Sequence, residues 1–376
     1  MSFRFIHASD LHLGIRFASI PEPPDGSIRG RLREARHAAI ARIADAARAH
    51  GAADILVAGD TFDTPTPSLS VVRQALAAMA EDAGLRWWLL PGNHDNLREA
   101  EPLWDLIARE SAANVRALTE AAPVRLSPKA TLLPCPIEWR SSGADPTEAL
   151  VAMPSDDGTM RIGLAHGAVT DFTDEGANIP PDRDRSARLE YLALGDWHGR
   201  MAVSPRVHYS GSPEQDRFKH GRRGVCLAVT IDGPGAPPEV AEVETGRFLW
   251  QDIALSLSPR QDAAAALSAV LPDEGRRDRL LRITPTGRAG LSDQADLQRA
   301  AARLGPEFAH FELRPGSLQI QYDVTDLDEI DRGGALRLAA DALMAEADGE
   351  TLSRQDREVA ADALARLYAY VKEARP

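Results

Sequence analysis

Residues 89–95 read Leu-Leu-Pro-Gly-Asn-His-Asp, and this stretch decides the fold class that we expect. It closes an apolar segment, Leu85–Leu90, which predicts a buried strand that stops at the Pro-Gly turn. An amide, an imidazole and a carboxylate follow directly, at Asn93, His94 and Asp95. A buried polar group without a partner costs about 1–3 kcal/mol, so three of them at one strand end indicate a binding site.

The same order of elements occurs twice before this stretch. Strands are predicted at Phe3–Ala8 and Asp54–Ala58, each runs into a polar loop, and helices follow at about 31–50 and 69–82. Strand, loop and helix in alternation are typical of an α/β protein, whose functional groups gather at the carboxyl ends of the strands.

The chain changes character near Gly246. Before that point, strands predicted at Met160–Ala165 and Tyr191–Leu194 again end in polar residues. Beyond it the polar strand ends stop, and alternating runs flank helices predicted at about 261–270, 294–304, 334–347 and 354–373. We therefore expect a first domain, a small second domain and a terminal helical segment, bounded at 1–247, 248–350 and 351–376.

Composition indicates a globular protein with room for two domains, since the chain has 376 residues of which 44% are hydrophobic. The formal net charge of −13 argues against a large basic surface for DNA, although bound divalent cations would offset part of it. Cys135 and Cys226 stand far apart, so no disulfide framework is expected. The sequence resembles no signal peptide and holds no membrane span, which predicts a cytoplasmic protein without membrane association.

Eight polar residues at the predicted strand ends form a candidate ligand set: Asp10, His12, Asp60, Asn93, His94, His166, Asp196 and His198. Imidazoles, carboxylates and an amide oxygen without a thiolate suit Mn, Fe or Zn. With His94 set aside, the others still exceed one tetrahedral site, so we expect two divalent cations that share Asp60. Two cations about 3.5–4 Å apart form a clamp for phosphoester cleavage, and His94 is the candidate proton donor to the departing oxygen.

Five short motifs occur in order: Asp10-x-His12, Gly59-Asp60-x-x-Asp63, Gly92-Asn93-His94-Asp95, His166-Gly167 and Gly195-x-x-His198. Together they resemble the signature of the calcineurin-like metallophosphoesterases. The resemblance implies an α/β (α+β) fold, a four-layer αββα sandwich followed by a small α+β capping domain. It also implies a ligand set for metal one, namely Asp10, His12, Asp60 and His198, and one for metal two, namely Asp60, Asn93, His166 and position 196. His94 would contact the phosphate.

Asp196 departs from that family pattern, which usually has a second histidine at this position. An aspartate is a competent ligand, but it adds a negative charge beside metal two and its reach differs from that of imidazole. We therefore expect metal two to favour a harder cation.

Two further segments, residues 6–14 and Tyr209–Pro213, are similar to those of SbcD-type DNA repair exonucleases. That resemblance implies a Mn-dependent exonuclease with single-strand endonuclease activity, partnered by an SbcC-type, SMC-like coiled-coil ATPase. Fe, Zn or Mg in place of Mn, and a homodimer, stay open. One alternative is a phosphodiesterase for small nucleotides or other non-DNA diesters, which the net charge favours. The other is a catalytically weakened structural subunit of an ATPase complex, which Asp196 motivates.

Four residues are candidates for contacts with DNA: Arg217, Lys219, Arg222 and Trp197. Trp197 stands between two ligands, so it either walls the site or stacks on a base. For a single basic cluster, such as the four arginines in 29–36, a solvated helix face is the more common role.

The predicted C-terminal helix carries an apolar stripe at helical spacing, made of Ala360, Leu364, Leu367, Tyr368 and Val371. Ser353 and Asp356 resemble a capping box, so the helix is predicted to begin there. The stripe either packs on the protein's own cap or, as the resemblance to SbcD-type nucleases implies, docks on the coiled-coil base of the ATPase.

Overall fold

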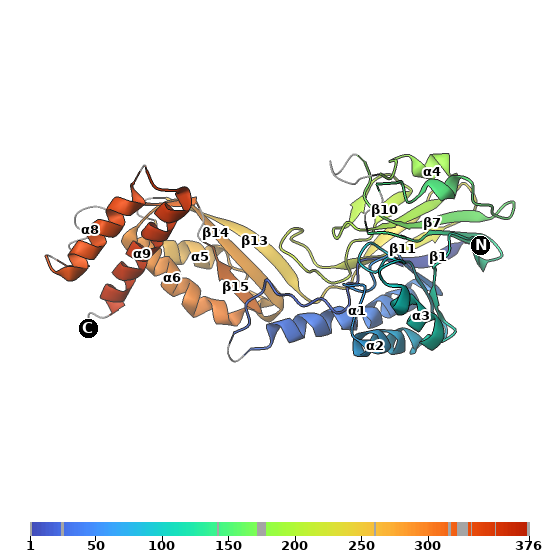
Figure 1. Cartoon of the computed structure of the whole chain (residues 1–376), viewed down its shortest axis with the longest axis horizontal. Coiled ribbons are helices and arrows are strands. Elements are labelled where there is room, and N and C mark those ends of the chain that lie inside the picture. The colour runs from blue at the N-terminus through green and yellow to red at the C-terminus, as the bar shows by residue number, and fades with distance from the viewer. Residues whose placement is uncertain are drawn as a thin grey trace. The chain divides into compact units, whose positions relative to one another are not determined.

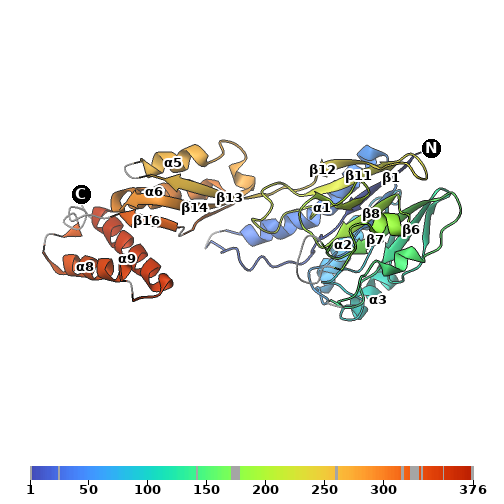
Figure 2. The same ribbon diagram turned by 90° about the horizontal axis from the view of Figure 1, so that it is seen from above.

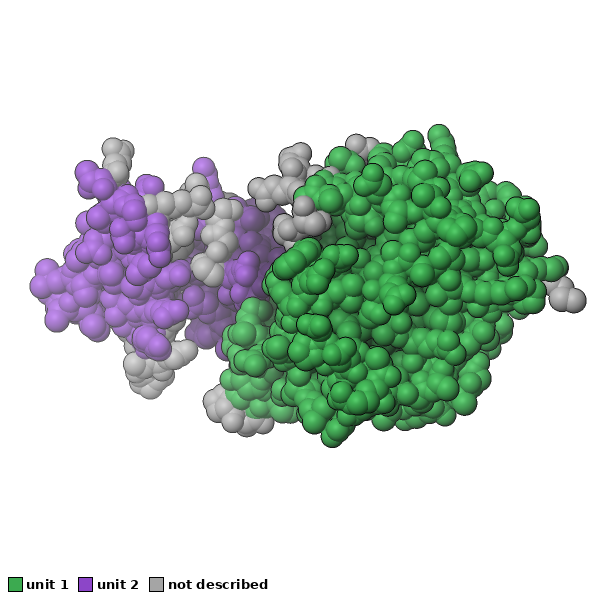
Figure 3. All heavy atoms as spheres, turned by 45° about the vertical axis from the view of Figure 1, so that its right-hand side comes forward, with its two compact units in different colours: residues 1–249 green, residues 250–376 purple. Residues whose placement is uncertain are grey.

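The computed structural model describes residues 2–23, 26–140, 143–170, 178–258, 261–314, 317–321, 330–331, 333–349 and 351–373. The chain divides into two compact units, residues 1–249 and 250–376, which Figure 3 colours separately. The segment expected at 351–376 is grouped with the second unit. Within the described ranges, no helix combines the length and the apolar character that crossing a membrane requires.

The first unit is built on two six-stranded sheets (Figure 1). The first sheet has the order β12-β11-β1-β2-β3-β4, in which β1 to β4 are parallel and β11 and β12 are antiparallel additions. Its strands are β1 (Phe3–Ala8), β2 (Asp54–Val57), β3 (Arg86–Leu89), β4 (Val115–Ala117), β11 (Val225–Ile231) and β12 (Glu239–Glu244). Three helices cover its outer face: α1 (Ile28–His50), α2 (Leu69–Ala80) and α3 (Glu101–Glu110).

The second sheet faces the first and has the order β5-β6-β7-β8-β10-β9. Its strands are β5 (Val124–Ser127), β6 (Ala130–Cys135), β7 (Met160–His166), β8 (Tyr191–Gly195), β9 (Met201–Ala202) and β10 (Val207–Tyr209). Side chains of both sheets meet in one buried cluster, for example Phe5 and Trp88 against Ile162 and Tyr191. Neighbouring residues of a strand point to opposite faces, so Trp87 packs under the helices while Trp88 lies between the sheets.

The expected α/β sandwich is confirmed, with a difference in its outer layer. The second sheet is covered by single turns, η1 (Glu148–Val151) and α4 (Arg183–Ser186), and by loops. Every residue of β7 is buried, so even this thin layer closes the outer face. Helix α3 was not among the expected elements, although Pro102 in its first turn and the spacing of Leu103 and Ile107 are helical signals.

The second unit is a small α+β domain (Figure 2). Its central strand β14 (Arg279–Gly290) is parallel to β15 (His310–Leu313) and β16 (Ser317–Gln321) and borders β13 (Leu249–Leu257). Helices α5 (Ala263–Val270) and α6 (Leu291–Leu304), with the single turns η2 (Arg276–Asp278) and η3 (Gly305–Glu307), complete this layer. Leu267, Leu281 and Leu297 share one buried cluster, which joins the helices to the sheet.

The C-terminal helix α9 (Arg354–Glu373) begins as expected, because Ser353 Oγ accepts the N–H of Asp356 at 3.1 Å. Its apolar stripe, however, is not free for a partner. Leu364 and Tyr368 are buried in a cluster with Leu291 of α6 and Ala340 of α8 (Ala335–Ala347). The stripe therefore packs on the protein's own second unit, which corrects the expectation that it forms a docking face.

We expect Leu364→Ala to lower the free energy of unfolding of the second unit by about 2–5 kcal/mol, because Leu364 is fully buried. Denaturant unfolding of the full chain measures this loss. Val359→Ala on the same helix is the matched control, since Val359 is 63% exposed and should change stability by less than about 0.5 kcal/mol. Equal effects of the two substitutions would show that α9 does not pack on this cluster.

Candidate metal centre

The predicted ligands gather at the carboxyl ends of β1, β2, β3, β7 and β8, where both sheets of the first unit contribute loops. Backbone hydrogen bonds join these loops. The N–H of Asp10 donates to Gly59 O at 3.1 Å, and the N–H of His12 donates to Asp60 O at 2.9 Å. The N–H of Asp196 donates to the Asp10 carboxylate at 3.1 Å, which ties the second sheet to the first.

Four of the predicted ligands have a backbone conformation that side chains other than glycine rarely adopt. Among the described residues, six non-glycine residues have positive φ, and Asp10 (55°), His12 (42°), Asp60 (53°) and Asp196 (100°) are four of them. Such conformations cost about 1–3 kcal/mol each and concentrate at functional sites. The fold therefore holds these four side chains in place against local preference.

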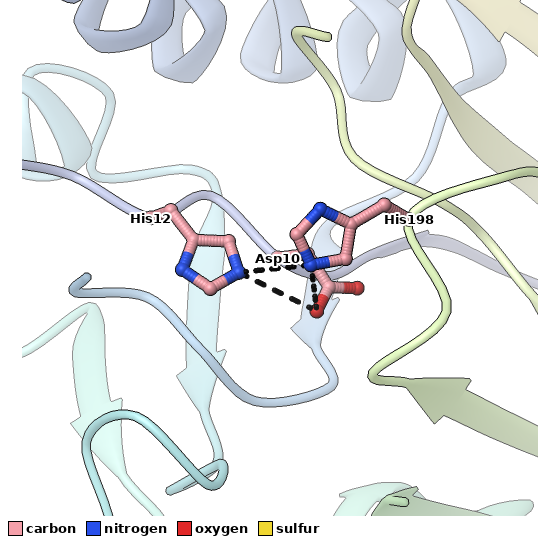
Figure 4. A group of neighbouring side chains, drawn as sticks. All are labelled: Asp10, His12 and His198. Carbon is pink, nitrogen blue, oxygen red and sulfur yellow. Dashed lines mark hydrogen bonds and ion pairs between the residues drawn. The ribbon is translucent and has the colours of Figure 1, made fainter. Parts of the chain in front are cut away.

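The first ligand group consists of Asp10, His12 and His198 (Figure 4). The two Nε2 atoms lie 3.2 Å apart, and each is 3.9 Å from Asp10 Oδ1. Atoms that share one cation at about 2.1 Å lie about 3–3.5 Å from one another. The nitrogens already have this separation, and the carboxylate needs only a small movement to reach it.

The second ligand group is centred on Asp60. Its Oδ2 lies 3.5 Å from His12 Nε2 and 3.5 Å from His166 Nε2, while its Oδ1 accepts the N–H of His94 at 2.9 Å. One carboxylate oxygen therefore faces both groups, as a bridging ligand requires. Asp196 Oδ1 lies 3.8 Å from His166 Nε2 and accepts Asn93 Nδ2 at 3.0 Å.

These side chains fit a pair of cations, because their inward-facing atoms have no partner in the protein. His166 Nε2 and Asn93 Oδ1 are buried and make no hydrogen bond, which is costly unless a ligand satisfies them. Burial alone would lower the pKa of His166, but the charges of Asp60, Asp10 and Asp196 raise it to about 9. The excess of carboxylates therefore attracts positive charge, which divalent cations would supply.

Each imidazole of the site turns its Nδ1 toward an oxygen and its Nε2 toward the ligand groups. The Nδ1 of His166 lies 2.8 Å from Ala58 O, and that of His94 lies 2.8 Å from Asp63 O. The Nδ1 of His12 is 3.3 Å from Asp63 Oδ1 but is not aligned for a hydrogen bond. Such outer contacts fix the tautomer and leave Nε2 free for a cation.

The buried carboxylate of Asp95 organises the loop after β3. It accepts the N–H of Gly92 at 2.7 Å and that of Phe62 at 3.0 Å, and burial next to Asp60 raises its pKa to about 7. A Cβ on Gly92 would lie 2.2 Å from Asp60 Oδ1, so only glycine lets this loop approach the bridging carboxylate. Trp104 of α3 donates to Asp95 O at 2.6 Å and supports the same loop.

Sequence reasoning missed two residues that contact the ligand loops. Arg36 is not solvated as its cluster suggested, because it is 1% exposed and its guanidinium donates to Leu11 O and Glu214 O, both at 2.7 Å. Its phase gave a signal, since it stands four residues from both Leu32 and Ile40 on the buried face of α1. Asp216, whose Oδ2 is 2.9 Å from His198 Nδ1, belongs to none of the five motifs.

Two of the four candidates for contacts with DNA are engaged elsewhere. Arg217 makes a paired contact with Asp216, and Arg222 forms an ion pair with Glu242 of β12. Lys219 and Trp197 instead contact each other, with the Lys219 ammonium 4.2 Å from the centre of the indole ring. An aromatic face with a cation above it therefore adjoins the ligands Asp196 and His198.

We expect Asp196→Ala to weaken the binding of one of two cations by at least about 10-fold, and Trp197→Ala to change neither by more than about 3-fold. The reason is the contact of Asp196 with Asn93 and its approach to His166, whereas Trp197 offers no ligand atom. Titration of the metal-free protein with Mn²⁺ measures both constants. Unchanged metal content and rate in Asp196→Ala would show that Asp196 is not a ligand.

Comparisons with known proteins agree with this geometry. The family model described as calcineurin-like phosphoesterase matches residues 3–225. The uncharacterized metallophosphoesterase YhaO of Bacillus subtilis (strain 168) is 28% identical over 242 residues, which are 61% of this chain and 58% of that protein. The match thus spans less than two thirds of that relative. A crystal structure of TT1561 from Thermus thermophilus aligns with 64% of this chain and 99% of that one, at 9% identity and a TM-score of 0.40, which is too low to support an argument.

Proposed function

This chain belongs to the calcineurin-like phosphoesterases, and we propose that within this family it is a Mn-dependent DNA phosphodiesterase. The observation that carries the proposal is the pair of ligand groups that meet at Asp60 Oδ2. Two neighbouring cations at such a site would clamp a phosphoryl group, neutralise its developing charge and provide a nucleophile at neutral pH. The mixture of carboxylate, amide and imidazole ligands, including the additional carboxylate Asp196, supports Mn as the cation.

The protein's own residues orient the reacting groups in this proposal. His94 is half-buried beside His12, with their ring centres 4.7 Å apart. Its Nδ1–H donates to Asp63 O, so Nε2 is directed to the site and can hold the proton that the departing oxygen needs. Since the backbone N–H of His94 also holds Asp60, the proton donor and the bridging carboxylate are fixed relative to each other.

DNA as the substrate is supported by the Trp197–Lys219 pair at the rim of the ligand groups. A nucleic acid strand presents alternating phosphates and aromatic faces, which a cation and an indole bind together. A small diester offers at most one such pair, and the net charge of −13 favours this rival because it opposes a long polyanion.

We further propose an SbcC-type coiled-coil ATPase as the partner, on the strength of the sequence resemblance. Because the stripe of α9 is covered, docking would use other side chains of the second unit. Val359 and Tyr370 of α9, which are 63% and 67% exposed, are available for it. Co-purification of the full chain with such an ATPase, before and after Tyr370→Ala, tests this part separately from catalysis.

The test of the function compares labelled single-stranded DNA, labelled double-stranded DNA and bis-p-nitrophenyl phosphate as substrates, each with Mn, Mg, Zn or Fe. We expect cleavage of DNA from its ends with Mn. Hydrolysis of the small diester without any cleavage of DNA would favour the small-diester phosphodiesterase instead. Cations bound without hydrolysis of any substrate would identify a weakened structural subunit.

A further inference from the structure

The segment 210–217 follows the last family motif and wraps around the first ligand group. Ser212 Oγ donates to Asp10 O at 3.1 Å, and Ser212 N–H donates to His198 O at 2.9 Å. Glu214 O accepts the buried guanidinium of Arg36, which also donates to Asp10 O at 3.2 Å. The loops that carry Asp10 and His198 are therefore held by one continuous stretch of chain.

Asp216 is the residue of this segment that contacts a ligand side chain. Its carboxylate is 4% exposed, and its Oδ2 lies 2.9 Å from His198 Nδ1. His198 Nε2, on the other side of the ring, faces Asp10 and His12 (Figure 4). With Nδ1–H donated to Asp216, the Nε2 lone pair is directed at the first ligand group, and the negative charge makes this nitrogen a stronger ligand.

Arg217 fixes the carboxylate in turn. Its Nε donates to Asp216 Oδ1 and its Nη2 to Asp216 Oδ2, both at 2.9 Å, which is the paired geometry that holds a carboxylate in one plane. The same Nη2 lies 3.0 Å from His198 Nδ1. Both nitrogens are donors when Nδ1 carries its proton, so they meet because they share Asp216 Oδ2 as an acceptor.

We propose that Asp216 is a positioning residue for the first cation, acting through His198, and that Arg217 keeps its carboxylate in place instead of contacting DNA. The other imidazoles of the site turn Nδ1 to residues inside or next to the family motifs, Ala58 and Asp63. For His198 the acceptor comes from outside the motifs. This inference rests on the proposed two-cation site but is independent of the substrate.

The test measures cation binding without substrate, by titrating the metal-free full-length protein with Mn²⁺ and counting bound metal. Asp216→Ala should weaken one binding step by about 10–100-fold and leave the other within about 3-fold. The weakened step should be the one that His198→Ala abolishes. Asp216→Asn keeps an oxygen that accepts Nδ1–H, so it should recover at least half of the loss on a logarithmic scale.

Glu110→Gln is the matched control, because Glu110 makes the same paired contact with Arg73 on an exposed surface and should change neither step. The unfolding temperature in EDTA is recorded for every variant. Equal binding by Asp216→Ala and the parent would overturn the proposal. So would a common loss of both steps and of the unfolding temperature in both Asp216 variants, since Asp216 would then hold the fold. A parent that binds no cation contradicts the proposed function itself, and this is seen before any variant is made.

Discussion

Asp60→Asn is expected to abolish the binding of both cations and to lower the rate of diester hydrolysis by at least about 10³-fold. An outer contact of a metal ligand is worth about 10–100-fold, and Asp60 is a shared inner ligand whose Oδ2 faces His12 and His166 at 3.5 Å. The asparagine still accepts the N–H of His94 through its oxygen and then turns its NH₂ toward the site. Two donor hydrogens would therefore replace the bridging lone pairs.

The same substitution should not destabilise the metal-free protein. Asp60 lies among the carboxylates of Asp10, Asp95 and Asp196, and its charge is one cause of the raised pKa of Asp95 and Asp196. Removing one of several like charges from a buried cluster relieves repulsion. In EDTA, Asp60→Asn should unfold at the temperature of the parent or above it.

Added Mn²⁺ then separates the two proteins. A ligand at 100 times its dissociation constant stabilises the folded state by about 2.7 kcal/mol, so Mn²⁺ should raise the unfolding temperature of the parent but not that of Asp60→Asn. Asp45→Asn is the control, since Asp45 is an exposed partner of Arg48. Stabilisation of Asp60→Asn by Mn²⁺ to the same extent as the parent would rule out Asp60 as the shared ligand.

The gathering of ligands at one end of the sandwich could be predicted because it follows from local patterns. Parallel strands leave their carboxyl ends at one edge, so Asp10, Asp60 and Asn93 had to lie close together once β1, β2 and β3 were recognised. The x between Asp10 and His12 was expected to put both on one side of an extended segment. The structure reaches the same result differently, with both residues at positive φ in a tight loop.

Contacts that depend on how distant segments return to the site could not be predicted in this way. Asp216 meets His198 only because the chain after β10 folds back over the first ligand group. Nothing in the residues around 216 indicates that meeting. Arg217 likewise reads as a candidate for DNA, since its neighbour Asp216 becomes its partner only through the local backbone geometry.

The C-terminal helix illustrates a different limit. An amphipathic pattern shows that a face is covered, and it does not say by what. Leu364 and Tyr368 are covered by α6 and α8 of the same unit, as favourable tertiary packing within the chain requires no partner. The pattern was interpreted correctly as a helix, and the choice between an internal and an external cover needed the structure.

His94→Ala is expected to keep both cations and to lower kcat for DNA by about 10²–10⁴-fold, the usual contribution of a positioned proton donor. The contact that holds Asp60 comes from the backbone N–H of His94, which alanine retains. The imidazole itself is anchored at Nδ1 by Asp63 O and so has only Nε2 to offer. Bound metal per chain and single-turnover rates measure the two effects separately.

The leaving group decides between proton donation and mere contact with the phosphate. An alkoxide leaving from DNA or from a dinucleotide needs a proton, whereas p-nitrophenolate leaves readily without one. If His94 protonates the departing oxygen, His94→Ala should therefore lose much less rate on bis-p-nitrophenyl phosphate than on a dinucleotide. Equal losses on both substrates would assign His94 to binding the phosphate, and loss of one cation would make it a ligand, which its place within 4.8 Å of ligand atoms of His12 and Asp60 allows. Because the variant changes one ring and leaves the loop's backbone bonds intact, these outcomes distinguish the three roles in a single protein.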